Sequence, residues 1–267
     1  MHFKGHFEPE QPSSAMASIW RGIVTAIILI AFWWLAVFVF QPAPFILPGP
    51  VKVAASLWSQ SSSLLYHAGI TLVEIILGLA LGLVLGVATA LLVNAQPLAR
   101  RYVMPVIVAS QALPVFAIAP LLVLWFGLGL GSKIAMATLI IYFPVASALN
   151  DGLLRTDRNW IDIAKMFGAS PLQTLVKIRL PAAMPALATG TRLAATIAPI
   201  GAVVGEWVGA SGGLGYVINQ ANARMQTDIV FAGLVLLIIM VIALRLVIDL
   251  ILDKLVFWAP RTQTTFA

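Results

Sequence analysis

The chain has 267 residues, of which 61% are hydrophobic and only 10% are charged. A soluble domain carries about 25% charged residues, so a single soluble core could not hide this much apolar surface, and lipid is the expected solvent. The net charge of +6 fits the Lys and Arg of cytoplasmic loops, and no basic cluster with aromatics indicates a nucleic-acid partner. With no cysteine and three scattered histidines, neither thiol chemistry nor a metal site is expected.

A membrane-spanning helix needs about 20 mostly apolar residues, and six segments meet or approach this requirement. The third and fifth contain internal prolines, which leave carbonyl groups unpaired, so these two are expected to face protein or a cavity rather than lipid. We therefore predict a single all-α membrane domain with six transmembrane helices. The predicted spans are 22–40, 69–93, 102–126, 134–149, 186–208 and 229–252.

The charges of the loops predict the orientation. With the N-terminus inside, eleven Lys and Arg residues fall on the cytoplasmic side and three on the outer side, which is a positive-inside bias. Both termini and the loop 151–181 are then cytoplasmic. The predicted organisation is a cytoplasmic tail at 1–21, a transmembrane domain at 22–258 and a second cytoplasmic tail at 259–267. The flanks of the first span do not resemble a cleaved signal peptide.

Two outer segments have a distinct composition. The proline-rich run 42–50 resists helix formation, after which the apolar spacing of 51–58 predicts a short helix at the membrane surface. The glycine-rich segment 209–215 is predicted to be a flexible outer loop.

The loop 151–181 is a charged island between apolar segments, and it carries two helix signals. In 159–167, apolar residues recur at i, i+3, i+4 and i+7, which predicts a short amphipathic helix that ends at Gly168. Ser170 then suits an N-cap, with Pro171 at the first helical position. The second helix is expected to end near Ile178, and Pro181 to mark the turn into the fifth span. Two such helices form either a rigid protrusion or a connector that lies on lipid.

The spacing within this loop resembles that of a known family. Asp162-Ile163-Ala164, three residues, Gly168, nine residues and Ile178-Arg179-Leu180-Pro181 are similar to the coupling motif of binding-protein-dependent ABC importer permeases, which is commonly Glu-Ala-Ala, three residues, Gly, nine residues and Ile-x-Leu-Pro. Asp162 replaces the glutamate and Ile163 the first alanine. The coupling residues that the resemblance implies are Asp162, Ala164, Gly168, Ile178, Leu180 and Pro181.

This resemblance extends over nearly the whole chain and implies a type I importer permease in a bacterial inner membrane. It implies two permease copies, a cytoplasmic ABC ATPase dimer that contains the ATP and Mg, and one extracytoplasmic solute-binding protein. The protrusion would insert into a groove of the ATPase, and transport would proceed by alternating access. No cofactor is expected in this chain, and whether the two permease copies are identical stays open.

Within the family, the chain is most similar to the nitrate, sulfonate and taurine type. The segments 205–209, 211–216 and 222–228 resemble permeases for the hydroxymethylpyrimidine precursor of thiamine. This resemblance implies a pyrimidine as the substrate, and taurine, an alkanesulfonate or nitrate is the alternative.

Several ionisable residues lie within the predicted spans, where each costs about 2.5–3.5 kcal/mol on insertion scales. Glu74 and Glu206 lie in the outer half, and they either line the translocation path or cap backbone groups in broken helices. Arg192 lies deeper and is a third candidate for the translocation path; it needs a partner from another span, for which Glu74 is a candidate. Arg245 and Asp249 are spaced i, i+4 and are expected to pair on one helix.

Three further patterns have competing interpretations. The stripe of Gly78, Gly82 and Gly86 permits close helix packing, either within the chain or between two copies. The segment 127–134 departs from a phosphate loop, so the chain is not expected to hydrolyse ATP. The segment 209–213 matches the G-x-S-x-G pattern of serine hydrolases. An alternative to a transporter is therefore an outer-face membrane hydrolase that uses Ser211 as the nucleophile and His67 as the base. A scaffold membrane protein is a third option.

Overall fold

The computed structural model describes residues 15–110 and 114–259, and within these ranges every regular element is a helix, without a strand. Five of its helices are long and apolar enough to cross a membrane, which agrees with the predicted all-α membrane fold. The predicted tails 1–21 and 259–267 lie largely outside the described residues. In chain order the elements are α1 (Ala15–Phe40), α2 (Pro50–Ser59), α3 (Ser61–Ala95), α4 (Pro97–Ser110), α5 (Val115–Phe126), α6 (Leu130–Leu154), α7 (Arg158–Met166), α8 (Pro171–Thr174), the π-helical η1 (Leu175–Arg179), α9 (Leu180–Gly209), α10 (Leu214–Ala223) and α11 (Thr227–Leu255).

Helix α6 forms the centre of the bundle, where it packs against both α3 and α9. The glycine stripe of α3 makes the first contact close. A Cβ atom on Gly78 would lie 2.5 Å from the Cβ of Ala137, and one on Gly82 would lie 2.5 Å from Cγ2 of Ile141. Small residues allow helix backbones to approach in this way. The stripe is therefore used for packing within the chain, which is one of its two predicted roles.

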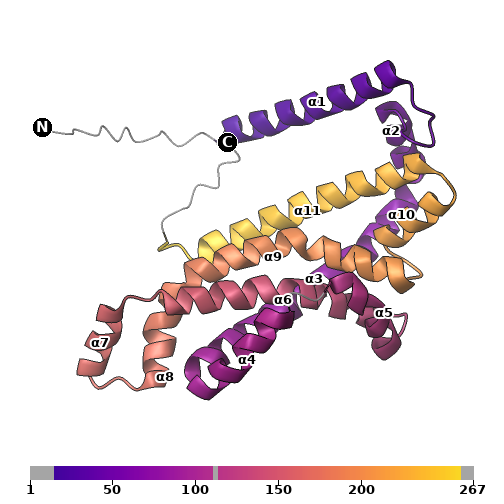
Figure 1. Ribbon diagram of the computed structural model, residues 1–267. Coiled ribbons are helices and arrows are strands. Elements are labelled where there is room, and N and C mark those ends of the chain that lie inside the picture. Colours follow the sequence, from indigo (N-terminus) through magenta and orange to yellow (C-terminus); the bar gives the residue numbers. More distant parts are fainter. Residues whose placement is uncertain (1–14, 111–113, 260–267) are drawn as a thin grey trace, which may run out of the picture.

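The two ends of the bundle are built differently (Figure 1). Helices α7 and α8 project from one end, whereas α2, α5 and α10 lie at the opposite end. Helix α1 is mostly exposed along its length and reaches α11 where Trp33 stacks on Phe231, with ring centroids 5.3 Å apart.

The predicted third span is broken in the structure. Instead of one helix over 102–126, the structure has α4 with 14 residues and α5 with 12 residues, each shorter than the roughly 20 residues that cross a bilayer. Pro114 is the N-cap residue of α5, a position where its missing N–H is tolerated. Among the described residues of the two helices, only Ile107, Ala119 and Leu122 are buried hydrophobics.

Other boundaries also differ from the prediction. Helix α6 has 25 residues and is longer than the predicted span 134–149. It begins before Lys133 and continues past Asp151, whereas the prediction left both charged residues outside the span. The short helix predicted at 51–58 is confirmed as α2, with Pro50 at its first turn.

Candidate functional site

The protrusion, residues 158–179, begins with the first predicted short helix, α7. The side chain of Asp157 caps this helix by accepting a hydrogen bond from the backbone N–H of Asn159, 2.9 Å away. The helix ends at Met166, and Gly168 follows two residues later with a φ of +74°, a left-handed conformation that glycine adopts without strain. The backbone N–H of Ala169 donates to the carbonyl of Ala164 at 2.9 Å, which satisfies a terminal carbonyl. The predicted stop at Gly168 is therefore present.

The bend after Gly168 is fixed by a capping box. Ser170 Oγ accepts from the backbone N–H of Gln173 at 3.2 Å, and Gln173 Oε1 accepts from the backbone N–H of Ser170 at 2.9 Å. Pro171 occupies the first helical position, as the sequence predicts. The two reciprocal bonds pair backbone N–H groups at the start of α8 and fix where this helix begins.

Pro181 does not mark a turn, and this prediction was wrong. Helical structure continues without a break from Pro171 to Gly209. The backbone N–H of Leu180 bonds to the carbonyl of Leu175, five residues back, so the chain passes through a π-helical turn directly before the proline, which has no N–H to donate.

The protrusion exposes apolar side chains at its tip. Met166 is 86% exposed and Phe167 is 87% exposed, and Trp160, Ile163 and Leu172 are exposed as well. Of the predicted apolar face of α7, only Ala164 is buried. Exposed apolar clusters of this kind are typical of interaction sites.

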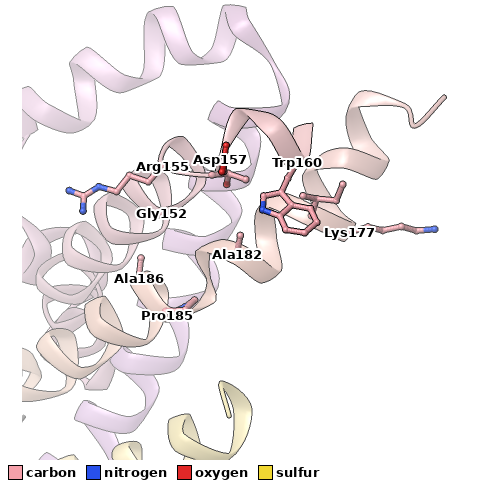
Figure 2. A pocket seen from close by; sticks show the side chains of 10 residues that line it. Gly152, Arg155, Asp157, Trp160, Lys177, Ala182, Pro185 and Ala186 are labelled. Atoms are coloured by element: carbon pink, nitrogen blue, oxygen red, sulfur yellow. The ribbon is translucent and has the colours of Figure 1, made fainter. Parts of the chain in front are cut away.

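A hollow of about 680 Å³ lies where the protrusion meets α6 and α9. Figure 2 shows the indole of Trp160 beside this hollow, with Ala182, Pro185 and Ala186 on the α9 side. The side chains of Arg155 and Lys177 point away from it. The hollow is thus lined mainly by small and apolar groups, and charged residues of both signs, Asp157 as well as Arg155 and Lys177, lie at it.

The motif residues shape the protrusion and contribute little to its exposed tip. Ala164 is buried, Gly168 makes the turn, and Leu180 packs beside the buried cluster of Leu149, Leu153 and Leu175. Asp162 is an exception, because it is exposed and pairs with Lys165 at 3.2 Å.

At the opposite end of the bundle lies a capping cluster, which comprises His67, Thr71, Lys133, Glu206 and the backbone of 213–215. Three of its side chains, those of His67, Thr71 and Glu206, bind the N-terminus of α10. His67 Nδ1 accepts from the N–H of Gly213 at 3.1 Å, Thr71 Oγ1 accepts from that of Leu214 at 2.8 Å, and Glu206 Oε2 accepts from that of Gly215 at 2.5 Å. The free N–H groups of a helix start are therefore paired with side chains from α3 and α9. The segment 209–215 is held in place here, contrary to the predicted flexible loop.

Glu206 is enclosed by this cluster. Its side chain is buried, its Oε1 accepts from Thr71 Oγ1 at 2.6 Å, and a Cβ atom on Gly213 or Gly215 would overlap its carboxylate. Glycine at both positions lets the backbone approach the carboxylate, and Gly213 also has a φ of +107°. The sequence did not identify Thr71, and it offered His67 only as a candidate catalytic base, because the capping role of both residues depends on the packing of α10 against α3.

Lys133 performs a similar capping role. Its Nζ donates to the carbonyls of Leu128, Gly129 and Gly209, with the last two at 2.8 Å and 2.7 Å. The one lysine of the glycine-rich segment 127–134 is therefore paired with backbone carbonyl groups.

Glu74 lies beside Glu206, within hydrogen-bonding reach of its carboxyl group. It is equally buried, and among the described residues its Oε2 has no hydrogen-bond partner. The structure therefore brings Glu74 and Glu206 together and encloses both within the chain.

Arg192 lies elsewhere, and the predicted pairing with Glu74 was wrong. Its guanidinium contacts Asp249 and Asp253 of α11, each at 2.8 Å. Arg245 pairs with Asp249 at 2.9 Å, as the i, i+4 spacing predicts. The sequence could not identify the Arg192 partners, because they depend on how α9 and α11 pack.

Ser211 does not form a hydrolase site with His67. His67 Nδ1 is already occupied by the N–H of Gly213, and the glycines around Ser211 precede the capped helix α10. The strand-turn-helix that a nucleophile elbow requires is absent from the described residues around it.

The fold and the bent protrusion define a polytopic membrane protein of the permease class, and comparison with known proteins identifies its family. The family model described as "Binding-protein-dependent transport system inner membrane component" matches residues 78–258, and the chain belongs to this family. It is an inner-membrane permease subunit of an ABC importer, with ATP hydrolysis in a separate subunit and not in this chain.

A probable ABC transporter permease protein of Haemophilus influenzae is 48% identical over 86% of this chain and 94% of the relative. The formylaminopyrimidine transport permease protein ThiX of Halalkalibacterium halodurans is 38% identical over 73% of this chain and 78% of the relative. Less similar relatives are named for riboflavin, taurine and aliphatic sulfonate transport. Among solved structures, a chain of the MetNI methionine ABC transporter in an inward-facing conformation matches with a TM-score of 0.64 and 22% identity, over 73% of this chain and 97% of that chain.

Proposed function

We propose that this permease imports a pyrimidine of the thiamine-precursor type. The observation that carries the proposal is the similarity to ThiX, which is named for a formylaminopyrimidine, together with the resemblance of 205–209, 211–216 and 222–228 to hydroxymethylpyrimidine permeases. Some of these residues have structural contacts, such as Asp228 Oδ2, which accepts from Ser56 Oγ of α2 at 2.6 Å. The resemblance therefore supports descent from a pyrimidine permease more than it describes a binding site.

The test is the ligand retained by the solute-binding protein that works with this permease. Binding should be measured by calorimetry with hydroxymethylpyrimidine, formylaminopyrimidine, taurine, nitrate and riboflavin in parallel. Retention of either pyrimidine supports the proposal. Retention of taurine or nitrate would establish the alternative substrate class, and retention of riboflavin would contradict both.

The same proposal places both termini and the protrusion in the cytoplasm, where the protrusion docks on the ATPase dimer. The charge bias of the loops and the exposed Met166 and Phe167 support it. In this arrangement Ala164, Gly168, Ile178, Leu180 and Pro181 set the shape of the protrusion. The coupling residue Asp162 lies on its exposed surface, beside the apolar tip that enters the ATPase groove.

A second copy of this chain would complete the permease, and a distinct partner permease is the alternative. Purification of the complex with two differently tagged copies tests this point. Recovery of both tags together supports a homodimer, and recovery of one tag only would contradict it.

The role of Glu74, Arg192 and Glu206 in a translocation path stays a prediction. Because both glutamates are buried within the chain, a capping role for Glu206 has the stronger support. Replacement of each by a neutral residue (Glu74→Gln, Arg192→Gln or Glu206→Gln) should be followed by uptake and assembly assays. Normal uptake in all three variants would refute the path hypothesis.

A further inference from the structure

The guanidinium of Arg179, the variable residue of the Ile-x-Leu-Pro motif, binds two helices of the bundle at once. Nη2 donates to Asn94 Oδ1 of α3 at 2.9 Å and to the carbonyl of Leu153 of α6 at 2.9 Å, and Nε donates to the same carbonyl at 3.3 Å. Leu153 lies in the last turn of α6, where carbonyls have no partner within the helix. Arg179 thus connects the base of the protrusion to the ends of α3 and α6.

The contacts of Asn94 extend this connection. Its Nδ2 donates to Asn150 Oδ1 of α6 at 3.0 Å and to the carbonyl of Ala90 at 2.9 Å. The side-chain amide is therefore oriented so that its oxygen faces the guanidinium. Three segments that are distant in sequence meet in one hydrogen-bonded network.

The network lies beside a hollow of about 530 Å³ between the end of α3 and the protrusion. Asn94 and Arg179 line it, as do Lys165, Ser170 and Leu172 of the protrusion. Next to the network, Leu175 is buried against Ala90, Leu149 and Leu153. The base of the protrusion therefore contacts the bundle through both apolar packing and a polar network.

We propose that Arg179 is a positioning residue that transmits movement of the protrusion to α3 and α6. The planar fork of a guanidinium can hold two acceptors in a fixed geometry, which a lysine ammonium cannot do equally well. A rotation of the protrusion therefore displaces the ends of both helices together. This inference rests on the proposed docking of the protrusion on the ATPase.

The experiment uses the complete complex of permease, ATPase and binding protein in proteoliposomes, with Arg179→Met in the permease. The ATPase is expected to co-purify and to keep its basal ATP hydrolysis. Stimulation by the ligand-loaded binding protein, and uptake of the ligand, are expected to fall by about tenfold or more, the size associated with a hydrogen bond to a charged group. Unchanged stimulation and uptake would overturn the inference.

Lys177→Met is the matched control, because Lys177 lies two residues earlier, is exposed and points away from the bundle in Figure 2. It is expected to keep at least half of the stimulation. An equal loss in both variants would overturn the inference, because loss of charge alone would explain it.

A second variant keeps the test valid if Arg179→Met does not assemble. Asn94→Leu removes the acceptor in α3 without touching the protrusion, and it is expected to keep ATPase binding while stimulation falls. Wild-type stimulation in Asn94→Leu would overturn the inference. Failure of the wild-type permease to retain the ATPase would instead refute the proposed docking, and the inference with it.

Discussion

The protrusion and the capping cluster differ in which kind of side chain they expose and which kind they bury. In the capping cluster, polar groups are buried and their hydrogen bonds go mainly to the backbone of the same chain, as for Glu206 and Lys133. In the protrusion, apolar groups such as Met166 and Phe167 are exposed. The first region completes its interactions within the chain, whereas the second presents a surface that only another molecule can cover.

This difference indicates where substitutions should affect stability and where they should affect assembly. A buried polar group that loses its partner is costly, so changes in the capping cluster should unfold or loosen the permease. An exposed apolar group contributes little to stability, so changes at the tip should spare the fold and weaken binding of the ATPase.

The largest effect is expected for Gly213→Ala. The new Cβ atom would overlap the Glu206 carboxylate, and alanine would be strained at a φ of +107°, so the loss of stability should exceed about 3 kcal/mol. Thermal unfolding in detergent measures it. Gly69→Ala is the control, because no atom lies within 4 Å of its Cβ position, and its Tm should stay unchanged or rise. A normal Tm for Gly213→Ala would contradict the described geometry.

A smaller loss, about 1–3 kcal/mol, is expected for Glu206→Gln. Both carboxylate oxygens of Glu206 accept hydrogen bonds, and an amide has only one oxygen to offer. Glu74→Gln should leave Tm unchanged or raise it, because Glu74 Oε2 has no hydrogen-bond partner among the described residues that the substitution would remove. The same thermal assay compares the two, and a larger loss for Glu74→Gln would reverse the assigned roles.

For Phe167→Ser, Tm is expected to stay at the wild-type value, because the side chain is 87% exposed and its removal leaves no cavity. Co-purification with the ATPase should fall strongly. Leu124→Ser, at an exposed position of α5, serves as the control that should keep the ATPase. Full ATPase retention by Phe167→Ser would argue against docking through the tip.

Only a small effect on stability is expected for Asp162→Asn. Its ion pair with Lys165 joins two side chains that are about two-thirds exposed, and such pairs contribute roughly 0–1 kcal/mol. The Tm should therefore change by less than in any capping-cluster variant. A drop in Tm as large as that of Glu206→Gln would show that Asp162 stabilises the fold although its side chain is exposed.

The comparison also explains what the sequence could predict. The bends of the protrusion depend on local signals, such as Gly168 and the Ser170-Pro171 pair, and these were predicted correctly. Apolar length likewise predicted most spans, although the third predicted span contains two short helices, the second of which begins after Pro114.

The missed features depend on contacts between distant segments. Thr71 resembles an ordinary residue of an apolar helix until α10 packs on it, and the capping role of His67 depends on the same packing. Arg179 occupies a variable position of its motif. The partners of Arg192 lie 57 and 61 residues away. Spacing within one segment contains no information about such pairings, so the polar networks could not be predicted in advance.

The most direct test of the partner surface uses the absence of cysteine from the chain. A single Phe167→Cys substitution provides one thiol at the exposed tip, which a maleimide reagent should label rapidly in the permease alone. Labelling should become at least about tenfold slower when the ATPase is bound, as for a position buried in an interface. Equal labelling rates with and without the bound ATPase would contradict the claim that the tip is the docking surface.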